Sequence, residues 1–441
     1  MRIVIFSIAM ICALPVLADA PVSSGTEGAI ERTAVQSAGP GSRSSQFDPV
    51  ERSRGQLQLR WLFQFYEFGD VSEELNVLPV ETPPSNWTSI VPQLGFGSPR
   101  GFFRNQVGVI ASSMGHGTII RNFTNSPNGQ DRRIGLHIEG NLPAGGAEFL
   151  IADMLNPTML LATRVTIRPM VLLWTKAVRR QPVEFDHRDL AKPLGRWITG
   201  FTFASDLFAP STQKDWGTTS LLGFENEIVG IDDHRGRVLG YVDVNLLTRV
   251  GEAAGAGTHV GVDLAGTASR FRIEVKAELN FAAPGYVPGY FDQTYVIERN
   301  QAFGLEEPKF DLVAPASFGY LGKMSLVYLP YISVFSEITD QIPVNPSEGT
   351  NNIRLMNGMS ASWLMFQLTF SLSQAGVTNY IEEALRGRGL LFISEGRISL
   401  LWSYLQLVGR YFRLHEEDKS SANAFKVIEG GFVGLEVNLG F

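Results

Sequence analysis

Strict alternation of apolar and polar residues is the feature that most constrains how this chain folds. From Arg270 to Phe281, one set of alternate positions holds Phe, Ile, Val, Ala, Leu and Phe, and the other holds Arg, Arg, Glu, Lys, Glu and Asn. Because successive side chains of a β-strand point to opposite faces, this segment predicts a strand with one apolar and one charged face. At about 3.3 Å per residue it reaches roughly 40 Å, or about 30 Å along a membrane normal at a tilt of about 40°.

That length matches the hydrocarbon core of a bilayer, and energetics set the orientation of the strand. Each Arg or Lys turned toward lipid at mid-membrane would cost on the order of 2–4 kcal/mol. The charged row is therefore expected to face an enclosed interior, and the apolar row to face lipid. An edge strand of a soluble β-sandwich alternates in the same way and is the alternative, although unbroken alternation over this length is long for such a strand.

The last ten residues, Phe432 to Phe441, alternate in the same way. Counting back from Phe441 in twos gives Phe, Leu, Val, Leu and Val, whereas the other register is small or polar except at its start. The segment resembles the closing strand of bacterial outer-membrane β-barrels, in which a C-terminal Phe with aliphatic residues at every second position before it is read by the assembly machinery. The resemblance implies that Val437, Leu439 and Phe441 form the assembly signal. It reaches the class of porin-like barrels of Gram-negative bacteria and indicates no subfamily.

The N-terminal region predicts export. Residues 1–18 have the charged start, short apolar run and small-residue cleavage site of a secretory signal peptide. Residues 19–54 are rich in Ser, Gly, Ala and Pro and too poor in large apolar groups to offset their ordering entropy, so we interpret them as a flexible periplasmic leader or, alternatively, a plug segment. The only cysteine, Cys12, lies in the signal peptide, which suits a chain that passes through an oxidising compartment.

Residues 55–441 show no second composition boundary and no internal run of about 18 apolar residues that would indicate a transmembrane helix. We therefore predict an all-β fold, a closed antiparallel transmembrane β-barrel of roughly 14–16 strands. Closure is required because an open sheet edge in hydrocarbon would leave N–H and C=O groups without partners. The proline-rich stretch Glu67–Phe102 predicts a loop, and in Gly389–Leu414 only a turn near Glu395-Gly396 is legible.

Two other stretches leave more than one interpretation open. Short alternations at Asn105–Ser113 and Thr118–Phe123 predict two short strands separated by Met114-Gly115-His116-Gly117. Gly285–Tyr331 is rich in Tyr and Phe, which is typical of the aromatic girdles of membrane barrels and also of ordinary loop packing.

The charge composition bears on which partners the chain can bind. The formal net charge of −7 is mild for 441 residues and gives no electrostatic case for binding nucleic acid. The resemblance implies the cell outer membrane as the location. Outer-membrane lipid and lipopolysaccharide, the barrel-assembly machinery and small polar solutes are then the expected partners, with a homo-oligomer as an open alternative to a single copy.

A barrel of this size can hold a water-filled lumen. We interpret the chain as an outer-membrane channel for passive diffusion of small hydrophilic solutes. One alternative is that the inward charges pair across strands and rigidify the wall. Another is a lipid-handling barrel, either a hydrophobic-compound transporter or a lipid-modifying enzyme, with a charge-filled lumen. The residues expected to line the pore are Arg60, Arg133, Arg164, Arg168, Arg270, Arg272, Glu274, Lys276 and Glu278.

The sequence gives little support for an enzyme. Ser113 and His116, in Ser-Met-Gly-His, are the best candidates for a nucleophile and its base. Their spacing does not follow the His-Glu-Ser or His-x-Ser arrangements of outer-membrane lipases and lipid A deacylases. Cys/His metal grids, phosphate loops, nucleophile elbows and HExxH motifs are absent from the sequence. We therefore expect no catalytic residue, no cofactor and no metal site.

Overall fold

The computed structural model describes residues 56–68, 88–97, 103–108, 110–125, 133–142, 145–155, 159–170, 197–211, 217–232, 236–249, 254–299, 308–312, 314–328, 331–347, 352–377, 389–401, 405–417 and 425–440. The expected signal peptide (residues 1–18), the expected leader (residues 19–54) and Phe441 of the expected assembly signal lie outside these residues.

The described chain is built almost entirely of β-strands, which form one sheet of 18 strands and a second sheet of three. No described helix combines the length and the apolar character needed to cross a membrane. The strands of the large sheet are β1 (Gln56–Phe68), β2 (Thr88–Gly97), β3 (Phe103–Gly108), β6 (Gly135–Leu142), β7 (Gly145–Ile151), β8 (Leu161–Ile167), β9 (Trp197–Ala209), β10 (Gly217–Asp232), β11 (Gly236–Arg249), β12 (Gly255–Ala268), β13 (Phe271–Ala282), β15 (Ser317–Tyr328), β16 (Ile332–Pro343), β17 (Asn352–Trp363), β18 (Phe366–Val377), β19 (Leu390–Leu401), β20 (Leu405–Glu417) and β21 (Phe425–Gly440).

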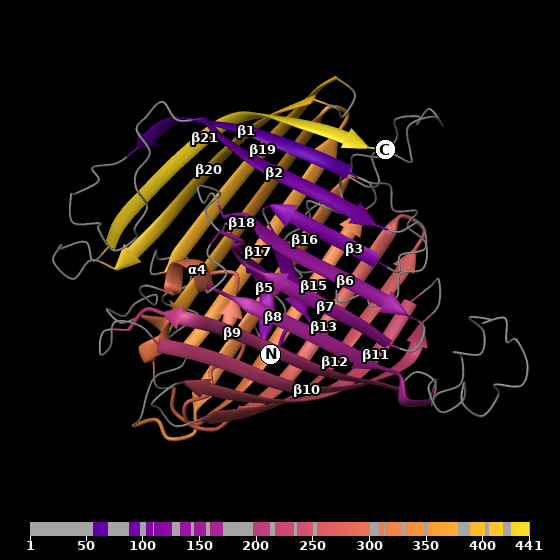
Figure 1. Cartoon of the computed structure of the whole chain (residues 1–441), viewed down its shortest axis with the longest axis vertical. Coiled ribbons are helices and arrows are strands. Elements are labelled where there is room, and N and C mark those ends of the chain that lie inside the picture. Colours follow the sequence, from indigo (N-terminus) through magenta and orange to yellow (C-terminus); the bar gives the residue numbers. More distant parts are fainter. Residues whose placement is uncertain are drawn as a thin grey trace, which may run out of the picture.

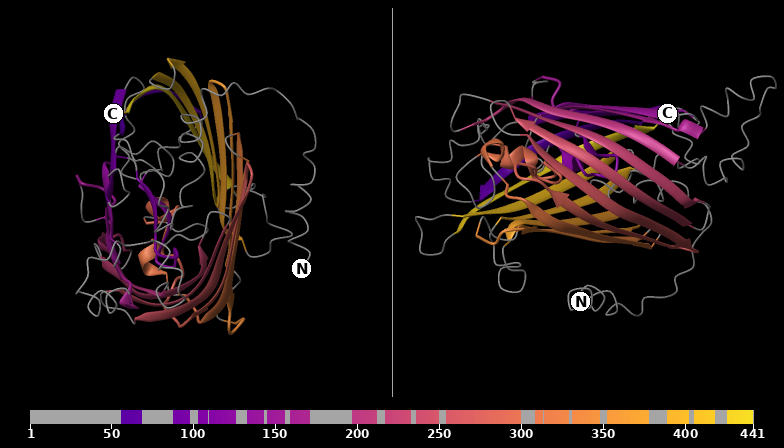
Figure 2. Two further views of the ribbon diagram at one scale, coloured as in Figure 1. Left: turned by 90° about the vertical axis from the view of Figure 1, so that its right-hand side faces the viewer. Right: turned by 90° about the horizontal axis from the view of Figure 1, so that it is seen from below.

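Neighbouring strands of the large sheet pair antiparallel in chain order, and the pairing returns to its start. Leu57 of β1 pairs with Leu94 of β2 on one side and with Leu439 of β21 on the other. Each described strand of the large sheet therefore has a partner on both sides, as a barrel requires. Figures 1 and 2 show the strands as a tilted wall that curves around an interior.

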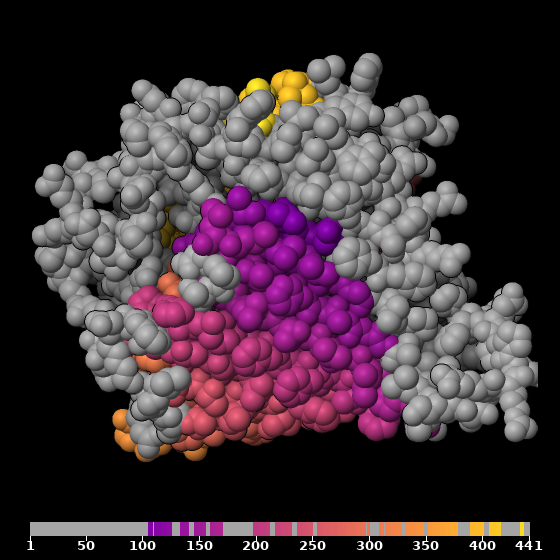
Figure 3. All heavy atoms as spheres, viewed as in Figure 1, coloured from indigo at the N-terminus to yellow at the C-terminus, as the bar shows by residue number. Residues whose placement is uncertain are grey.

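Side-chain exposure alternates along the wall. The exposed outer positions are mostly apolar, and many of the inner positions are polar or charged. In β11, Val242 and Val244 are 44% and 49% exposed, whereas Asp243 between them is fully buried. In β13, exposed positions alternate with less exposed ones from Phe271 onward. Figure 3 shows one face of this outer wall, over the strands β6 to β12, as a continuous surface. This arrangement reverses that of a soluble protein and fits a wall whose outer face meets lipid.

The predicted all-β antiparallel barrel is confirmed, and the sheet has 18 strands where spacing suggested roughly 14–16. Part of the difference is that the first half of the wall contains short strands such as β6 and β7, which two residues connect. The expected loop at Glu67–Phe102 contains β2, whose Pro92 disguised a strand. The expected turn near Glu395-Gly396 is wrong, because both residues lie inside β19, where Glu395 is buried and its side chain is ion-paired with Arg410.

Two connections fold into the barrel. The first, between β3 and β6, is a hairpin of β4 (Ala111–Met114) and β5 (Ile120–Thr124). The second, between β13 and β15, contains β14 (Phe291–Asp292), α4 (Tyr295–Glu298) and the 3-10 helix η3 (Lys309–Asp311). β14 pairs parallel with β5, so the two connections form one internal unit. Figure 2 shows β5 and α4 enclosed by the wall.

The internal unit has a hydrophobic core of its own inside the barrel. Side chains from both connections pack there against the inner face of β7 to β13. The short strands expected around Met114–Gly117 therefore exist, but part of this region is an internal hairpin rather than wall. Loop packing, not a girdle, accounts for the aromatic residues Tyr286, Tyr290, Phe291 and Tyr295, which are all buried in this core.

Candidate functional site

The tip of the β4–β5 hairpin presses against the wall at β10. Gly115 and Gly117 have φ values of +59° and +75°, which side chains other than glycine rarely adopt, so the chain turns sharply around His116. A Cβ atom on Gly115 would lie 2.7 Å from the carboxyl carbon of Glu225, too close for any real contact. The hairpin tip can approach β10 this closely because residue 115 has no side chain.

His116 is held between two carboxylates of the wall. Its Nδ1 lies 2.9 Å from Oδ1 of Asp243 in β11, and its Nε2 lies 2.8 Å from Oε2 of Glu227 in β10. The imidazole also stacks on Tyr241, with ring centroids 3.9 Å apart. Burial disfavours the charged imidazolium, but Asp243 and Glu227 outweigh it and raise the pKa of His116 to about 10. His116 is therefore a cation at neutral pH and donates a charge-assisted hydrogen bond from each nitrogen.

Two more hairpin residues connect β5 to strands farther around the wall. Arg121 lies 3.4 Å from Glu278 in β13. Asn122 donates a hydrogen bond of 3.1 Å from Nδ2 to Oε2 of Glu337 in β16. Together with the His116 contacts, these interactions fasten the hairpin to β10, β11, β13 and β16.

Glu278 links the hairpin to a deeper hydrogen-bond network. The Tyr241 hydroxyl donates to Oε2 of Glu278 at 2.6 Å, and Nδ1 of His259 lies 2.8 Å from Oε1. Nε2 of His259 in turn lies 2.8 Å from the Tyr286 hydroxyl, which belongs to the internal unit. Because Glu278 and His259 are fully buried, this network is costly to leave unsatisfied and holds its members in a single arrangement.

Arg164 makes a second ionic bridge below the hairpin tip. Its Nε and one terminal nitrogen lie 2.8 Å and 2.6 Å from Oε2 of Glu225, and its other terminal nitrogen lies 2.8 Å from Oε1 of Glu148. The Glu225 carboxylate that limits the space at Gly115 is thus itself fixed by a buried arginine. This arrangement makes the wall beneath the hairpin rigid.

A second set of ion pairs joins the α4 segment to the wall. Lys309 Nζ lies 2.5 Å from Oε2 of Glu298, and Arg354 of β17 lies 3.2 Å from the same carboxylate. On the other side, Arg299 lies 2.6 Å from Asp206 of β9. Burial disfavours the Glu298 carboxylate, yet Arg354 and Lys309 lower the pKa of Glu298 to about 2. Because six strands separate β9 from β17 in the sheet, the internal unit is tied to two distant parts of the wall.

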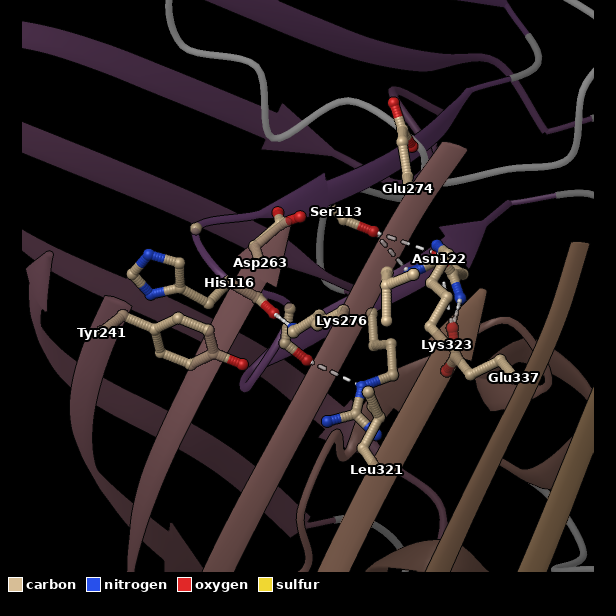
Figure 4. Close-up of a pocket in the computed structure, with 14 residues that line it drawn as sticks. Ser113, His116, Asn122, Tyr241, Asp263, Glu274, Lys276, Leu321, Lys323 and Glu337 are labelled. Carbon is tan, nitrogen blue, oxygen red and sulfur yellow. Dashed lines mark hydrogen bonds and ion pairs between the residues drawn. The ribbon is translucent and has the colours of Figure 1, made fainter. Parts of the chain in front are cut away.

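A polar pocket lies between the hairpin and the wall at β12, β13, β15 and β16. Figure 4 shows the labelled side chains that line it. Asp263, Lys276, Lys323 and Glu337 form a row across these four strands, because each residue is the direct register partner of the next. Arg121 approaches the same space from the hairpin.

The pocket presents charges of both signs on neighbouring strands. Lys276 and Lys323 lie directly opposite each other in a sheet, an arrangement that is unfavourable without compensating charges. Lys276 has Glu278 at 3.4 Å and donates to the His116 carbonyl, and Lys323 has Glu337 at 3.8 Å. A small polar solute in this opening would meet hydrogen-bond donors and acceptors of both charges.

The structure brings several predicted pore-lining residues together. Glu274 and Lys276 line the pocket, and Arg272 lies 2.7 Å from Glu274. Glu278 and Arg164 belong to the buried ionic networks behind the pocket and below the hairpin tip. Glu278 and Arg164 are each ion-paired across strands, as expected if inward charges pair and rigidify the wall.

The other predicted site residues lie apart from the pocket. Arg270 is in the exposed two-residue turn before β13. Arg133 precedes β6 and reaches a backbone carbonyl just beyond β5, and Arg168 is buried just after β8. Arg60 is described through its backbone pairing with β2 and β21. Of the expected assembly signal, Val437 and Leu439 lie in β21 and pair with β1.

Sequence reasoning missed the charged residues contributed by β10, β15, β16 and the hairpin. Lys323 and Glu337 complete the charged row, Glu225 and Glu227 receive the hairpin tip, and Arg121 enters the pocket. Alternation within Ser317–Tyr328 was a signal that could have placed Lys323 inside. No sequence signal showed that the hairpin would contact these strands.

The geometry does not pair Ser113 with His116 as nucleophile and base. Ser113 Oγ instead contacts Asn122, and both nitrogens of His116 are occupied by carboxylates. Another Ser–His contact places Ser112 Oγ 3.5 Å from Nε2 of His137, but the nearest carboxylate oxygen of Glu148 lies 4.0 Å from that same nitrogen. A catalytic relay uses the two nitrogens of the ring for different partners. Within the described chain, no group of three or more His, Cys, Asp or Glu residues is arranged to hold a metal ion.

No protein-family model matches the chain, and no curated protein has a matching sequence. Solved structures with similar strand arrangements include a BenF-like porin from Pseudomonas fluorescens Pf-5, with 8% identity, 89% of this chain and 100% of the porin covered, and a TM-score of 0.37. OccK11 (OpdR) from Pseudomonas aeruginosa has 9% identity, 89% and 97% coverage, and a TM-score of 0.39. CdiB from Acinetobacter baumannii has 8% identity and a TM-score of 0.38, with 88% of this chain covered. The chain spans 60% of the length of that CdiB.

Proposed function

We propose that this protein is an outer-membrane channel through which small hydrophilic solutes diffuse passively. The observation that carries the proposal is the pocket of mixed charge inside a barrel whose outer face is apolar. An apolar exterior with inward charge is stable only if lipid lies outside and water or paired charge lies inside. The open pocket, with partly exposed Lys276, Lys323 and Asp263, supports water inside.

In the proposed channel, the hairpin narrows the lumen and sets its polarity. His116 and Arg121 fix the hairpin to the wall, so the opening beside it has a constant shape. Lys276 and Lys323 attract anionic groups, and Asp263 and Glu274 attract cationic groups, in the same pocket. Passing solutes exchange hydrogen bonds with water for hydrogen bonds with these side chains, which favours polar over apolar solutes.

Outer-membrane lipid and lipopolysaccharide at the apolar exterior, and the barrel-assembly machinery acting on β21, belong to this proposal. The proposal includes no catalytic role for His116 and Ser113, because each of them is hydrogen-bonded to other partners. A lipid-handling barrel would need apolar space inside the wall. The apolar interior seen here is instead filled by the chain's own core, with Phe123 and Phe291 fully buried in it. These contacts favour the channel over the lipid-handling alternative.

Planar-bilayer recording of the purified protein tests the proposal. Protein that migrates differently on gels before and after boiling, as a folded barrel does, should produce discrete conductance steps. Lys323→Glu should raise the cation-to-anion permeability ratio, because it reverses a charge in the pocket. Arg413→Glu, the same reversal at an exposed position of β20, is the matched control and should leave the ratio unchanged. Folded protein without conductance would contradict the proposal.

A further inference from the structure

The turn between β17 and β18 exposes four large apolar side chains in succession. Trp363, Leu364, Met365 and Phe366 are 73%, 83%, 52% and 56% exposed. Exposure of single apolar residues is ordinary, but a continuous run at the tip of a tight turn marks a contact with something outside the chain. None of the four carries a charge, and a turn facing only water would normally hold polar residues or glycine.

Leu364 also occupies a backbone conformation that is unfavourable for leucine. Its φ is +52°, in the left-handed region that glycine and asparagine adopt most easily. The turn between β12 and β13 has the same length and a similar φ at its first residue, Ser269 at +54°, and there the two residues are Ser269 and Arg270. The fold therefore accepts a polar turn at a matched position, and folding alone does not explain the leucine.

The surroundings of the turn are apolar on both sides. The backbone of Ser362 donates to the carbonyl of Tyr331, and the backbone of Ser399 donates to the carbonyl of Met365, so the turn lies beside the ends of the neighbouring strand pairs. Ile332 and Leu400, at those ends, are 40% and 53% exposed. Along β18, the exposed row continues from Phe366 to Leu368, which places the turn in line with the apolar outer face of the wall.

We propose that the Trp363–Phe366 turn is embedded in the lipid bilayer, at the boundary between headgroups and acyl chains. The inference rests on the proposed membrane-spanning barrel and adds a specific contact to it. Its support is the continuity of the turn with the outer apolar face, which makes lipid the occupant with matching chemistry. Tryptophan is favoured at this boundary, because its ring is apolar and its N–H remains able to donate a hydrogen bond. The bilayer therefore surrounds the Trp363–Phe366 turn, whereas the Ser269-Arg270 turn extends beyond the bilayer into water.

Site-specific labelling can test this contact, because the chain has a single cysteine, Cys12. In a Cys12→Ser background, Leu364→Cys and the matched control Ser269→Cys are labelled with an environment-sensitive fluorophore and folded into phosphatidylcholine vesicles. The label at residue 364 should emit at shorter wavelength and be quenched by aqueous iodide about threefold less than the label at residue 269. It should also be quenched by lipids that carry a nitroxide near the headgroup. Equal access of iodide to both labels would overturn the proposal.

Two further measurements keep the outcome specific. The comparison is repeated at two protein-to-lipid ratios, and protection of residue 364 that disappears on dilution would indicate a second copy of the chain and overturn the lipid contact. Conductance and gel mobility before and after boiling are recorded on the same preparations. A folded barrel without conductance, but with residue 364 in lipid, would contradict the channel and leave the membrane contact standing. A conducting barrel with residue 364 in water would contradict the membrane contact and leave the channel standing.

Discussion

At the scale of single residues, His116 shows how a site can be visible in a sequence while its role is not. The sequence marks it as one of six histidines, beside two glycines and near a serine. Its partners, Glu227 and Asp243, follow 111 and 127 positions later. Only the fold of β10 and β11 brings these carboxylates to the imidazole, so sequence reasoning could find the residue but not its function as an anchor.

The two glycines of the hairpin tip give a prediction with a built-in control. In Gly115→Ala, the added methyl group would meet the Glu225 carboxyl group that Arg164 holds in place, so the hairpin or Glu225 must move. In Gly117→Ala, the nearest atoms lie 3.7 Å from the new carbon. Both variants bear the cost of a left-handed alanine, about 1–2 kcal/mol, so their difference isolates the contact with Glu225.

We expect Gly115→Ala to lower the free energy of unfolding by about 1–3 kcal/mol more than Gly117→Ala does. Urea titration of the two variants in detergent micelles measures the difference. Equal stability of both variants would show that the hairpin tip does not press against β10 as described.

At the scale of elements, the alternation of apolar and polar residues predicted the wall strands well, because one face of each meets lipid. It did not distinguish the strands of the internal unit from those of the wall. The rows of β11, β12 and β13 appeared clearly in the sequence, because the lipid-facing positions there are mostly apolar and the inward positions are mostly polar or small. In the internal unit, β5 packs apolar groups such as Ile120 and Phe123 against other parts of the chain, so wall and interior cannot be told apart by period. Pro92 concealed β2 for a different reason, since proline lacks the N–H that a strand donates.

The ion pairs at the α4 segment give a prediction at this scale. Lys309 is 1% exposed, and its Nζ lies 2.5 Å from Glu298 and 3.2 Å from Asp292. Glu298→Gln should destabilise the barrel by about 1–3 kcal/mol, because the buried cation loses the nearer of its two anionic partners. Lys309→Met in the same chain removes the cation and should recover a large part of that loss.

Thermal unfolding of the two single variants and the double variant, followed by the loss of β-sheet circular dichroism, gives the coupling between the residues. Additive losses in the double variant would mean that Lys309 and Glu298 do not support each other in the folded barrel.

At the scale of the whole molecule, the structure combines a lipid-facing wall with an interior that is partly filled. The hairpin and the α4 segment occupy the interior next to β7 to β13 with a hydrophobic core, and the charged pocket lies at the edge of that filling. The sequence predicted the wall, with an apolar outer face and a charged inner face. It did not predict the internal unit, because that unit depends on contacts between the connection after β3 and the connection after β13.

The central claim is that apolar rows of the wall touch lipid while charged rows touch water, and labelling of two adjacent positions in β13 tests it most directly. Ile273 is exposed on the outer face, and Glu274 lines the pocket. Single cysteines at these positions, in the Cys12→Ser background, are reacted with a charged thiol reagent after the barrel has folded into vesicles. We predict rapid modification of Glu274→Cys and protection of Ile273→Cys until detergent is added. Rapid modification of Ile273→Cys in intact vesicles, with Glu274→Cys protected, would contradict it.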